Sequence, residues 1–310
     1  MRVAVSGASG LIGARLVEAL RARGDEVIEL SRSGKDGAVR WDPSSEPAPA
    51  TALGGADGVV HLAAENIAQR WTARTREAIR TSRTVGTANL VAGIAAAKPR
   101  PRVLVSASAI GYYGNRGDEP LSETSSAGQD WLAQVCVDWE RAALRAAELG
   151  LRVCVLRTGV VLDAGGGALA QMLPPFRLGL GGPVAGGRQY LSWIHADDLV
   201  ALYVAALDDA RFSGPLNAVA PAAARNAEFA KALGHALHRP AVVGVPSVAL
   251  RALFGKMASV VTDSQNVLPE RALGLGVSFA HPELEEALLD TLSAPLSSRS
   301  SISRPPRPTR

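Results

Sequence analysis

The sequence is short of the residues and runs that mark secreted, metal-binding and membrane-spanning proteins. Only two of its 310 residues are cysteines, and the spacing of Cys136 and Cys154 suits neither a disulfide framework nor a metal site. No apolar run approaches the ~20 residues that cross a bilayer, and no signal peptide fits before a strand that begins at residue 2. We therefore expect reduced core thiols, no metal, no membrane partner and a cytoplasmic location.

Net charge is also absent from most of the chain. The formal charge is +4, but residues 296–310 hold four arginines and no acid, which leaves 29 basic and 29 acidic side chains in residues 1–295. A neutral body argues against nucleic-acid binding. The Ser/Pro/Arg-rich end has too few apolar side chains to offset the entropy of ordering, so we predict that residues 295–310 form a disordered basic tail.

Short apolar runs alternate with helical patterns in the first half of the chain. Continuous apolar strands separated by helices are typical of a parallel sheet that is covered on both faces. We therefore predict an α/β fold with a doubly wound parallel sheet and a smaller C-terminal α/β domain. The predicted strands are 2–6, 26–30, 39–41, 58–62, 103–106 and 152–156, and the predicted helices are 11–23, 72–97 and 129–149.

The amino-acid composition changes after Gly159, where glycine becomes frequent. Residues 163–187 contain eight glycines around a short apolar segment, a composition that indicates a loop region near a ligand. Regular patterns then return, with helices predicted at 196–207, 226–237, 247–256 and 283–292 and a strand at 215–219. We predict a cofactor-binding domain over 1–160 with returning elements at about 188–220, and a substrate-side domain over 161–187 and 221–294.

Three glycines follow the first predicted strand. Gly7, Gly10 and Gly13 stand between that strand and the helix predicted from residue 11. In a Rossmann fold one such glycine allows a sharp turn, one lets a pyrophosphate approach and one lets helix and strand pack closely. The free N–H groups and positive end of the helix then face the phosphates. The motif predicts a dinucleotide site that includes Ser9, Leu11 and Ile12, and the alternative is an ordinary turn.

The end of the second strand distinguishes NAD from NADP. An acid there accepts a hydrogen bond from the ribose of NAD, whereas an arginine pairs with the 2′-phosphate of NADP. Here Ser31 and Arg32 follow the strand with no acid before Asp36, which favours NADP(H) over NAD(H). The alternative is that Arg32 is a solvated surface charge. Asp42 either accepts from the adenine amino group or caps the turn before Pro43.

These motifs together resemble the extended short-chain dehydrogenase/reductase superfamily over residues 1 to about 292. Beyond the glycines, the resemblance rests on residues 61–64 (His-Leu-Ala-Ala), 85–90, 105–108 leading to 113–114, 157–161 and 193–198. The longer strings 108–114, 172–183 and 187–195 resemble the subgroup called epimerase family proteins, which are NAD(P)-dependent epimerase/dehydratase-like.

The usual catalytic pair of that superfamily is absent. There a Tyr and a Lys four residues later share one helix face, and the Lys lowers the Tyr pKa so that the phenolate can move a proton. None of the four tyrosines of this chain is followed by Lys at that spacing. The resemblance implies a catalytic role for Ser108, with Tyr113 or the adjacent Tyr112 as a source of a phenol. A structural role is the alternative for both tyrosines.

The resemblance also assigns residues to the cofactor and the substrate. Arg83 stands where the superfamily usually has Asn, and it is either a cation near ribose or phosphate, in place of the absent Lys, or a helix-surface charge. On the substrate side we expect Arg188, Trp193 and His195, although His195 also suits a helix cap. The other expected cofactor residues are Leu62, Ala63, Ala64, Ser106, Arg157, Gly159 and Val160.

Two functions are compatible with this pattern. One is an NADP-dependent oxidoreductase or epimerase-like enzyme that acts on a small polar metabolite, with a nucleotide sugar among the candidates. The other is a non-catalytic NADP(H)-binding sensor or scaffold, which the missing Tyr/Lys pair motivates. A homodimer through the helices near 72–97 and 129–149 is implied by the resemblance alone.

Overall fold

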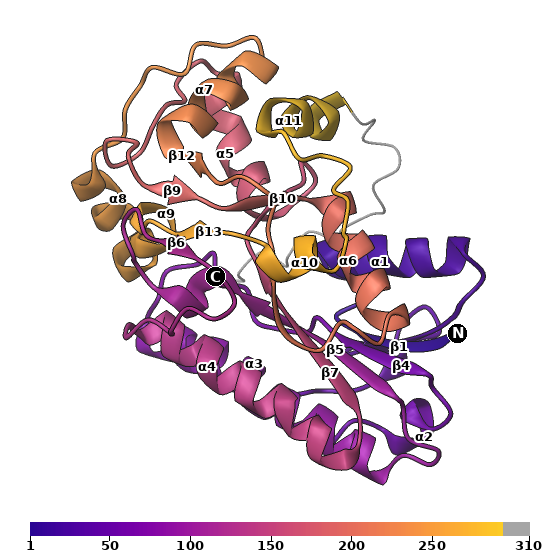
Figure 1. The fold of residues 1–310 in the computed structure, drawn as a ribbon. Coiled ribbons are helices and arrows are strands. Elements are labelled where there is room, and N and C mark those ends of the chain that lie inside the picture. Colours follow the sequence, from indigo (N-terminus) through magenta and orange to yellow (C-terminus); the bar gives the residue numbers. More distant parts are fainter. Residues whose placement is uncertain (294–310) are drawn as a thin grey trace.

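A parallel sheet of seven strands lies at the centre of the computed structural model, which describes residues 1–293 except for the side chains of residues 253 and 254 (Figure 1). The tail predicted at 295–310 lies outside the described residues. The strands are β1 (Arg2–Ser6), β2 (Glu26–Ser31), β3 (Val39–Arg40), β4 (Gly58–His61), β5 (Val103–Ala109), β7 (Arg152–Thr158) and β11 (Gly214–Ala218).

The strand order places a switch point beside β1. The order is β11-β7-β5-β4-β1-β2-β3, and every pairing is parallel. The chain extends the sheet in one direction from β1 through β2 and β3, and in the other direction from β4 onwards. Ligands of such sheets bind outside the carboxyl ends of the strands at this point.

Helices cover both faces of the sheet (Figure 1). Alternate residues of a strand point to opposite faces, and Val3 and Val5 accordingly join one apolar cluster while Ala4 joins another. The first cluster includes α1 (Leu11–Ala22) and α6 (Ala196–Asp208), and the second includes α2 (Ala50–Leu53) and α3 (Ala73–Ala96). The doubly wound α/β fold predicted from the sequence is therefore confirmed.

Several predicted bounds shift in the structure. β5 and β7 run to Ala109 and Thr158, three and two residues beyond their predicted ends. The predicted helix 129–149 is shorter, since α4 (Trp131–Leu144) gives way to a 3-10 turn, η2 (Arg145–Leu149).

The loop predicted over residues 163–187 is partly wrong, because this region contains a helix. α5 (Gly167–Arg177) buries Leu169, Leu173 and Phe176, which are spaced so that they share one helix face. The glycines lie at the start of this helix and beyond its end, so they mark its limits rather than disrupt it.

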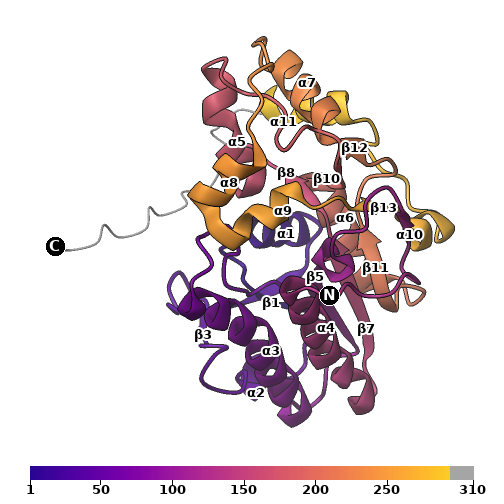
Figure 2. The same cartoon turned by 90° about the vertical axis from the view of Figure 1, so that its left-hand side faces the viewer.

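Apart from α6, α10 and β11, most elements after β7 build a second layer above the sheet (Figure 2). A third apolar cluster there joins α5, α7 and α11.

Among the helices of the described residues, none combines the length and apolar composition that a membrane crossing needs. The predicted domain boundaries stay a prediction. The remaining elements are β6 (Pro120–Leu121), β8 (Val160–Leu162), β9 (Tyr190–Leu191), β10 (Trp193–His195), β12 (Ala224–Arg225), β13 (Asn266–Val267), η1 (Ile110–Tyr113), α7 (Asn226–Ala236), α8 (Ser247–Phe254), η3 (Gly255–Ala258), α9 (Ser259–Thr262), α10 (Glu270–Gly274) and α11 (Leu284–Ser293).

The contact of α3 with the chain before α2 gives a test of this packing. A Cβ atom on Gly93 would lie 2.3 Å from the carbonyl oxygen of Ala48, whereas a Cβ on Gly274 would meet nothing within 4 Å. We expect Gly93→Ala to lower the free energy of unfolding by about 1–3 kcal/mol through overpacking. Gly274→Ala should leave it unchanged or raise it by up to ~1 kcal/mol. Urea unfolding followed by circular dichroism measures both, and equal stabilities would contradict the packing of α3.

Candidate functional site

Two glycines of the first turn are required by the fold itself. Gly7 has a φ of +74°, and a Cβ there would lie 2.7 Å from the backbone nitrogen of Ala63. A Cβ on Gly13 would lie 2.1 Å from the carbonyl oxygen of Gly7. A Cβ on Gly10 would meet only that same oxygen, at 3.2 Å. The demand for glycine from protein packing is therefore weakest at Gly10, where a pyrophosphate is expected to approach.

The start of α1 offers hydrogen-bond donors to a ligand. Gly10 is the N-cap of α1 and no side chain caps this end. The first N–H groups of a helix, here those of Leu11 and Ile12, lack partners within the helix. Ser9 and Gly10 are exposed beside them. These donors and the positive end of the helix dipole fit a dinucleotide pyrophosphate.

The chain after β4 lies directly against this turn. Leu62 donates its N–H to the carbonyl oxygen of Ser6 at 3.0 Å, which continues the sheet pairing beyond His61. Leu62 and Ala63 are half-buried and Ala64 is exposed. The three residues predicted at the cofactor thus lie at the carboxyl edge of the sheet, next to Gly7.

The end of β2 presents a free cation. Arg32 is exposed, and within the described part of the chain its guanidinium makes no hydrogen bond or ion pair. The Ser31 hydroxyl accepts from the N–H of Gly34 at 3.1 Å. Asp42 accepts from the N–H of Ser44 at 3.0 Å, so the turn-capping contact is present. Its contact with adenine stays a prediction.

His61 is a packed residue of β4. Its Nδ1 lies 2.6 Å from the Ser6 hydroxyl and its Nε2 lies 3.0 Å from the Thr87 hydroxyl. Burial lowers the pKa of His61 to about 4. The ring is therefore neutral at physiological pH, and it links β1, β4 and α3.

Ser108 lies in a buried network rather than on an open surface. Its hydroxyl donates to Glu140 Oε1 at 2.7 Å, and Arg157 donates to both oxygens of Glu140 at 2.8 Å. All three side chains are buried. Burial disfavours the charged form of Arg157, but its bonds with Glu140 outweigh that cost and raise its pKa. Glu140 was not among the predicted residues, although it stands one helical turn after Cys136 in a stretch expected to be helical.

Tyr113 and Tyr112 extend the same network. The Tyr113 hydroxyl donates to Asn217 Oδ1 at 2.7 Å and accepts from Arg157 at 3.0 Å. Burial raises the pKa of Tyr113. The guanidinium carbon of Arg157 lies 3.4 Å from the ring centroid of Tyr112. These contacts favour the structural alternative for both tyrosines, and the cofactor role of Arg157 and the catalytic roles stay predictions.

Arg83 is buried, so the helix-surface alternative for it is wrong. Its guanidinium donates to the carbonyl oxygens of Glu65 and Ile79 at 3.0 and 3.2 Å, and it lies 4.9 Å from the ring centroid of Trp139. Burial lowers the pKa of Arg83. No carboxylate pairs with it in the described part of the chain. A buried cation without an ion-pair partner is costly, which leaves it suited to an anionic ligand.

Leu132 and Cys136 of α4 pack closely against Gly111 of η1. A Cβ on Gly111 would meet Leu132 at 3.0 Å and the sulfur of Cys136 at 3.7 Å. Burial raises the pKa of the Cys136 thiol to about 12, so the thiol stays protonated. Ser106 is buried as well, and its hydroxyl donates to the carbonyl of Ala107 at 3.2 Å.

The junction between the sheet and the upper layer holds the remaining predicted residues. A Cβ on Gly159 would lie 2.7 Å from the carbonyl oxygen of Ser192, and Val160 donates its N–H to that oxygen at 2.9 Å. Trp193 is buried in the upper layer, and its indole N–H has no partner among the described residues. Arg188 is exposed.

His195 caps α6, which agrees with the capping alternative. Its Nδ1 accepts the N–H of Asp197 at 3.2 Å, so the proton of the neutral ring belongs on Nε2, which lies 3.4 Å from Asp290. His281 stacks on it at 3.8 Å between ring centroids. The possible ligand atoms of these four residues lie within 4.8 Å of one another. Because the one lone pair of His195 already accepts a backbone N–H, the arrangement suits a hydrogen-bonded cap better than a metal centre.

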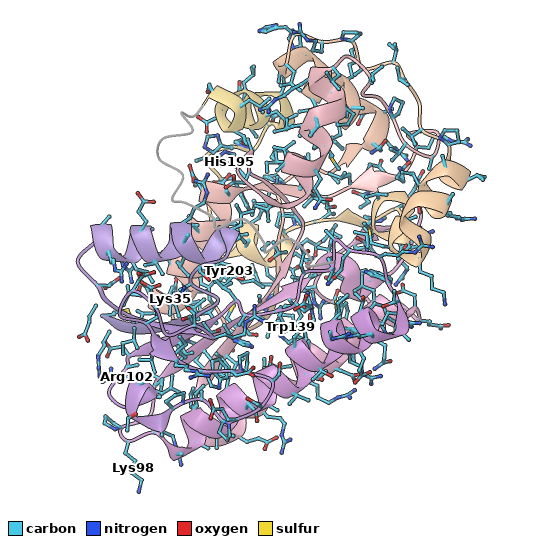
Figure 3. The ribbon with its side chains drawn as sticks, turned by 180° about the vertical axis from the view of Figure 1, so that it is seen from behind. Lys35, Lys98, Arg102, Trp139, His195 and Tyr203 are labelled. Atoms are coloured by element: carbon cyan, nitrogen blue, oxygen red, sulfur yellow. The ribbon has the colours of Figure 1, made fainter. Side chains whose placement is uncertain are left out.

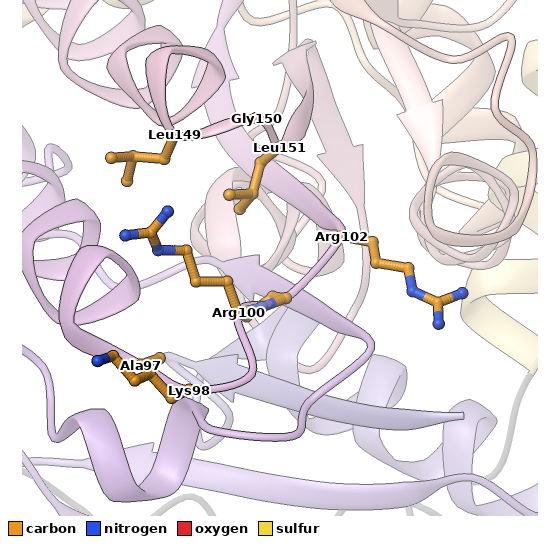
Figure 4. A pocket seen from close by; sticks show the side chains of 8 residues that line it. Ala97, Lys98, Arg100, Arg102, Leu149, Gly150 and Leu151 are labelled. Atoms are coloured by element: carbon orange, nitrogen blue, oxygen red, sulfur yellow. The ribbon is translucent and has the colours of Figure 1, made fainter.

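A surface pocket of about 430 Å³ lies at the amino edge of the sheet rather than at its carboxyl edge (Figure 4). It is lined by Lys98, Arg100 and Leu151, among others, beside the amino ends of β5 and β7. Figure 3 shows Lys98 at the bottom of the molecule and His195 in its upper half. Because ligands of doubly wound sheets bind at the carboxyl ends, this pocket is not the candidate cofactor site.

The sheet, its switch point and the glycine turn together define a dinucleotide-binding α/β protein. The model of the NAD dependent epimerase/dehydratase family matches residues 3–218, and that of a domain of unknown function matches residues 245–291. The chain belongs to the NAD dependent epimerase/dehydratase family.

Similar proteins carry the name epimerase family protein. Mb2239 of Mycobacterium bovis is 42% identical over 290 residues, which cover 92% of this chain and 96% of the relative. The chloroplastic SDR39U1 homolog of Arabidopsis thaliana is 41% identical, over 93% of this chain and 86% of the relative. The crystal structure of human SDR39U1 with NADPH is 38% identical and has a TM-score of 0.89, covering 95% of this chain and 100% of that chain. The subgroup predicted from the sequence is confirmed.

The buried pair of Glu140 and Arg157 generates a stability prediction. Glu140→Gln leaves the Arg157 cation buried without a counter-charge, so the free energy of unfolding should fall by about 3–5 kcal/mol. The matched control Glu148→Gln, at an exposed position of η2, should change it by less than about 0.5 kcal/mol. Denaturant unfolding measures both. A loss in Glu140→Gln no larger than in the control would show that the ion pair does not stabilise the fold.

Proposed function

We propose that the protein is an NADP-dependent oxidoreductase or epimerase-like enzyme that acts on a small polar metabolite. The observation that carries this proposal is the open end of α1, where backbone donors face the space next to Gly10 and no side chain caps the helix. Membership of the NAD dependent epimerase/dehydratase family supports it. The human relative that was solved with NADPH supports the choice of cofactor.

Particular residues are proposed to hold the cofactor. The first-turn N–H groups of α1 bind the pyrophosphate, and Arg32 with Ser31 binds the 2′-phosphate of the adenine ribose. Arg83 is proposed to supply the cation that the usual Lys supplies elsewhere, because its charge has no carboxylate partner among residues 1–293. The other predicted cofactor residues, Ser106, Asp42, Gly159 and Val160 among them, are proposed from the resemblance.

When bound, reduced nicotinamide would supply a hydride, and hydride transfer needs fewer catalytic side chains than proton transfer does. Ser108 is proposed to orient a substrate oxygen, but its hydroxyl is a poor acid or base at neutral pH. We place the substrate toward Arg188 and Trp193, and a nucleotide sugar is one candidate. An exposed arginine near the substrate would suit an anionic metabolite.

A second function has specific support. The hydroxyls of Ser108 and Tyr113 are both engaged in the buried network around Glu140 and Arg157. The chain also lacks the Tyr/Lys pair. These observations favour a non-catalytic NADP(H)-binding sensor or scaffold as the alternative.

Three further proposals rest on composition and resemblance. We propose a cytoplasmic location, a homodimer through α3 and α4, which lie side by side on one face of the sheet (Figures 1 and 2), and the domain division near residue 160. The name of the Arabidopsis relative places that protein in the chloroplast.

The cofactor preference is tested by calorimetric titration with NADPH and NADH. We expect NADPH to bind more tightly, and Arg32→Ala to weaken NADPH binding about tenfold, or ~1.4 kcal/mol, because a charge-assisted contact with the 2′-phosphate is lost. NADH binding should not change. Arg102→Ala, which removes another exposed arginine just before the amino end of β5, is the control. Equal affinity for both cofactors would contradict the NADP preference, and binding of neither would contradict both functions.

Turnover distinguishes the enzyme from the sensor. We expect the wild type to consume NADPH with at least one member of a carbonyl panel that includes keto-sugar nucleotides. Ser108→Ala should then lower kcat while NADPH affinity stays the same, because the hydroxyl would no longer orient the substrate. The loss of NADPH absorbance reports the rate. NADPH binding without consumption across the whole panel would favour the sensor.

A further inference from the structure

Residues 241–245 form an extended segment with only one paired edge. Val243 and Val245 donate their N–H groups to the carbonyl oxygens of Gly181 and Pro183 at 3.1 and 2.9 Å. Ala185 donates back to Val245 at 2.9 Å, and Val184 and Val245 form a parallel bridge. We call residues 241–245 the open edge.

The other side of the open edge has unpaired backbone groups. In an extended chain, successive residues direct their N–H and C=O groups to opposite sides. Val242 and Gly244 therefore face away from residues 181–185. Within the described part of the chain, neither has a hydrogen bond from its N–H or C=O. Exposed, unpaired backbone N–H and C=O groups along a strand edge can pair with a strand from another chain.

Apolar side chains gather around the open edge. Of the large hydrophobic side chains that are exposed in the described residues, five lie in two adjoining stretches, 178–182 and 242–248. Val242 is 81% exposed and Leu178 is 75% exposed. The chain between α7 and α8, which holds the open edge, runs along the outside of the upper layer (Figure 2). The five residues are Leu178, Leu180, Val242, Val243 and Val248.

The two stretches of chain that form the open edge carry basic side chains but no acidic ones. The sequence has no Asp or Glu from residue 164 to 196 or from residue 229 to 262. Arg177, Arg239 and Arg251 are exposed in these stretches. Arg239 donates to the carbonyl oxygen of Arg177 at 3.1 Å, which holds two of these arginines beside Leu178. Arg251 shares a face of α8 with the exposed Val248, because the two are three residues apart.

We propose that the open edge binds an extended acidic segment of a partner protein, which adds to it as a strand. The backbone of the segment would pair with Val242 and Gly244, its apolar side chains would cover the exposed leucines and valines, and its carboxylates would pair with the arginines. Main-chain bonds supply affinity and side-chain contacts supply specificity in this mode of recognition.

Other occupants fit the open edge less well. A bilayer cannot satisfy the unpaired N–H and C=O groups of Val242 and Gly244. A second copy of the chain would bring the arginines of both copies together. Residues 296–310 carry four arginines and no acid, so they are repelled in the same way. An acidic peptide alone satisfies the backbone, the apolar surface and the charge.

The test uses two fluorescent peptides and the full-length protein. The probe is an acetylated peptide that alternates glutamate and valine, and the control peptide alternates lysine and valine. Fluorescence anisotropy should show saturable binding of the acidic peptide, weakened by added salt, and at least about tenfold weaker binding of the basic one. Failure of the acidic peptide to bind, or equal binding of both peptides, would overturn the proposal.

Variants separate strand addition from non-specific attraction. Val242→Pro removes an outward N–H and Arg239→Glu reverses a charge while keeping the backbone, and each should weaken binding of the acidic peptide about tenfold. Val85→Glu alters an exposed apolar residue of α3 and should have no effect. NADPH affinity, measured in all variants, reports intact folding. Unchanged peptide binding in Arg239→Glu, or binding of phosphatidylserine vesicles in preference to the peptide, would contradict the proposal.

Discussion

The buried ion pair of Glu140 and Arg157 is the contact on which the rest of the site depends. It joins α4 to β7 beneath the carboxyl edge of the sheet, and both oxygens of Glu140 are engaged by one guanidinium. Through Ser108 it holds the end of β5, and through Tyr113 and Asn217 it reaches β11. Because each charge is buried, neither residue can be lost without leaving the other uncompensated. The network therefore ties α4, η1 and three neighbouring strands of the sheet together.

This network also changes the view of the family's chemistry in this chain. Where the cofactor is expected, no side chain caps α1 at Gly10, and Arg32 at the end of β2 makes no hydrogen bond or ion pair with the described residues. The residues expected to contact the substrate differ, since the hydroxyls of Ser108 and Tyr113 already donate to protein partners. The expected cofactor residues and the expected catalytic residues therefore differ in how far the protein itself already occupies their polar groups.

The sequence predicted the elements of the sheet well, because parallel strands covered on both faces are continuous apolar runs. It also located the glycine turn, in which Gly7 has a positive φ and a Cβ on Gly13 would collide with the carbonyl oxygen of Gly7. It failed at α5, where frequent glycines concealed a helix whose buried face is formed by Leu169, Leu173 and Phe176. It also missed Glu140, because nothing local reveals which face of α4 meets β5. For Arg83 the sequence allowed either a cofactor contact or a helix-surface charge, and its burial against Trp139 excludes the second.

The sequence by itself determined the class of fold, the glycine turn that follows β1 and the exposed arginine that follows β2. These properties depend on residues close together in the chain, where backbone geometry and strand periodicity act directly. Only the tertiary structure decided that Ser108, Tyr113 and Arg157 share one buried network, and that two acid-free stretches meet along the open edge. Those outcomes depend on which faces of distant elements pack together, and the free energy of that packing is a property of the assembled core.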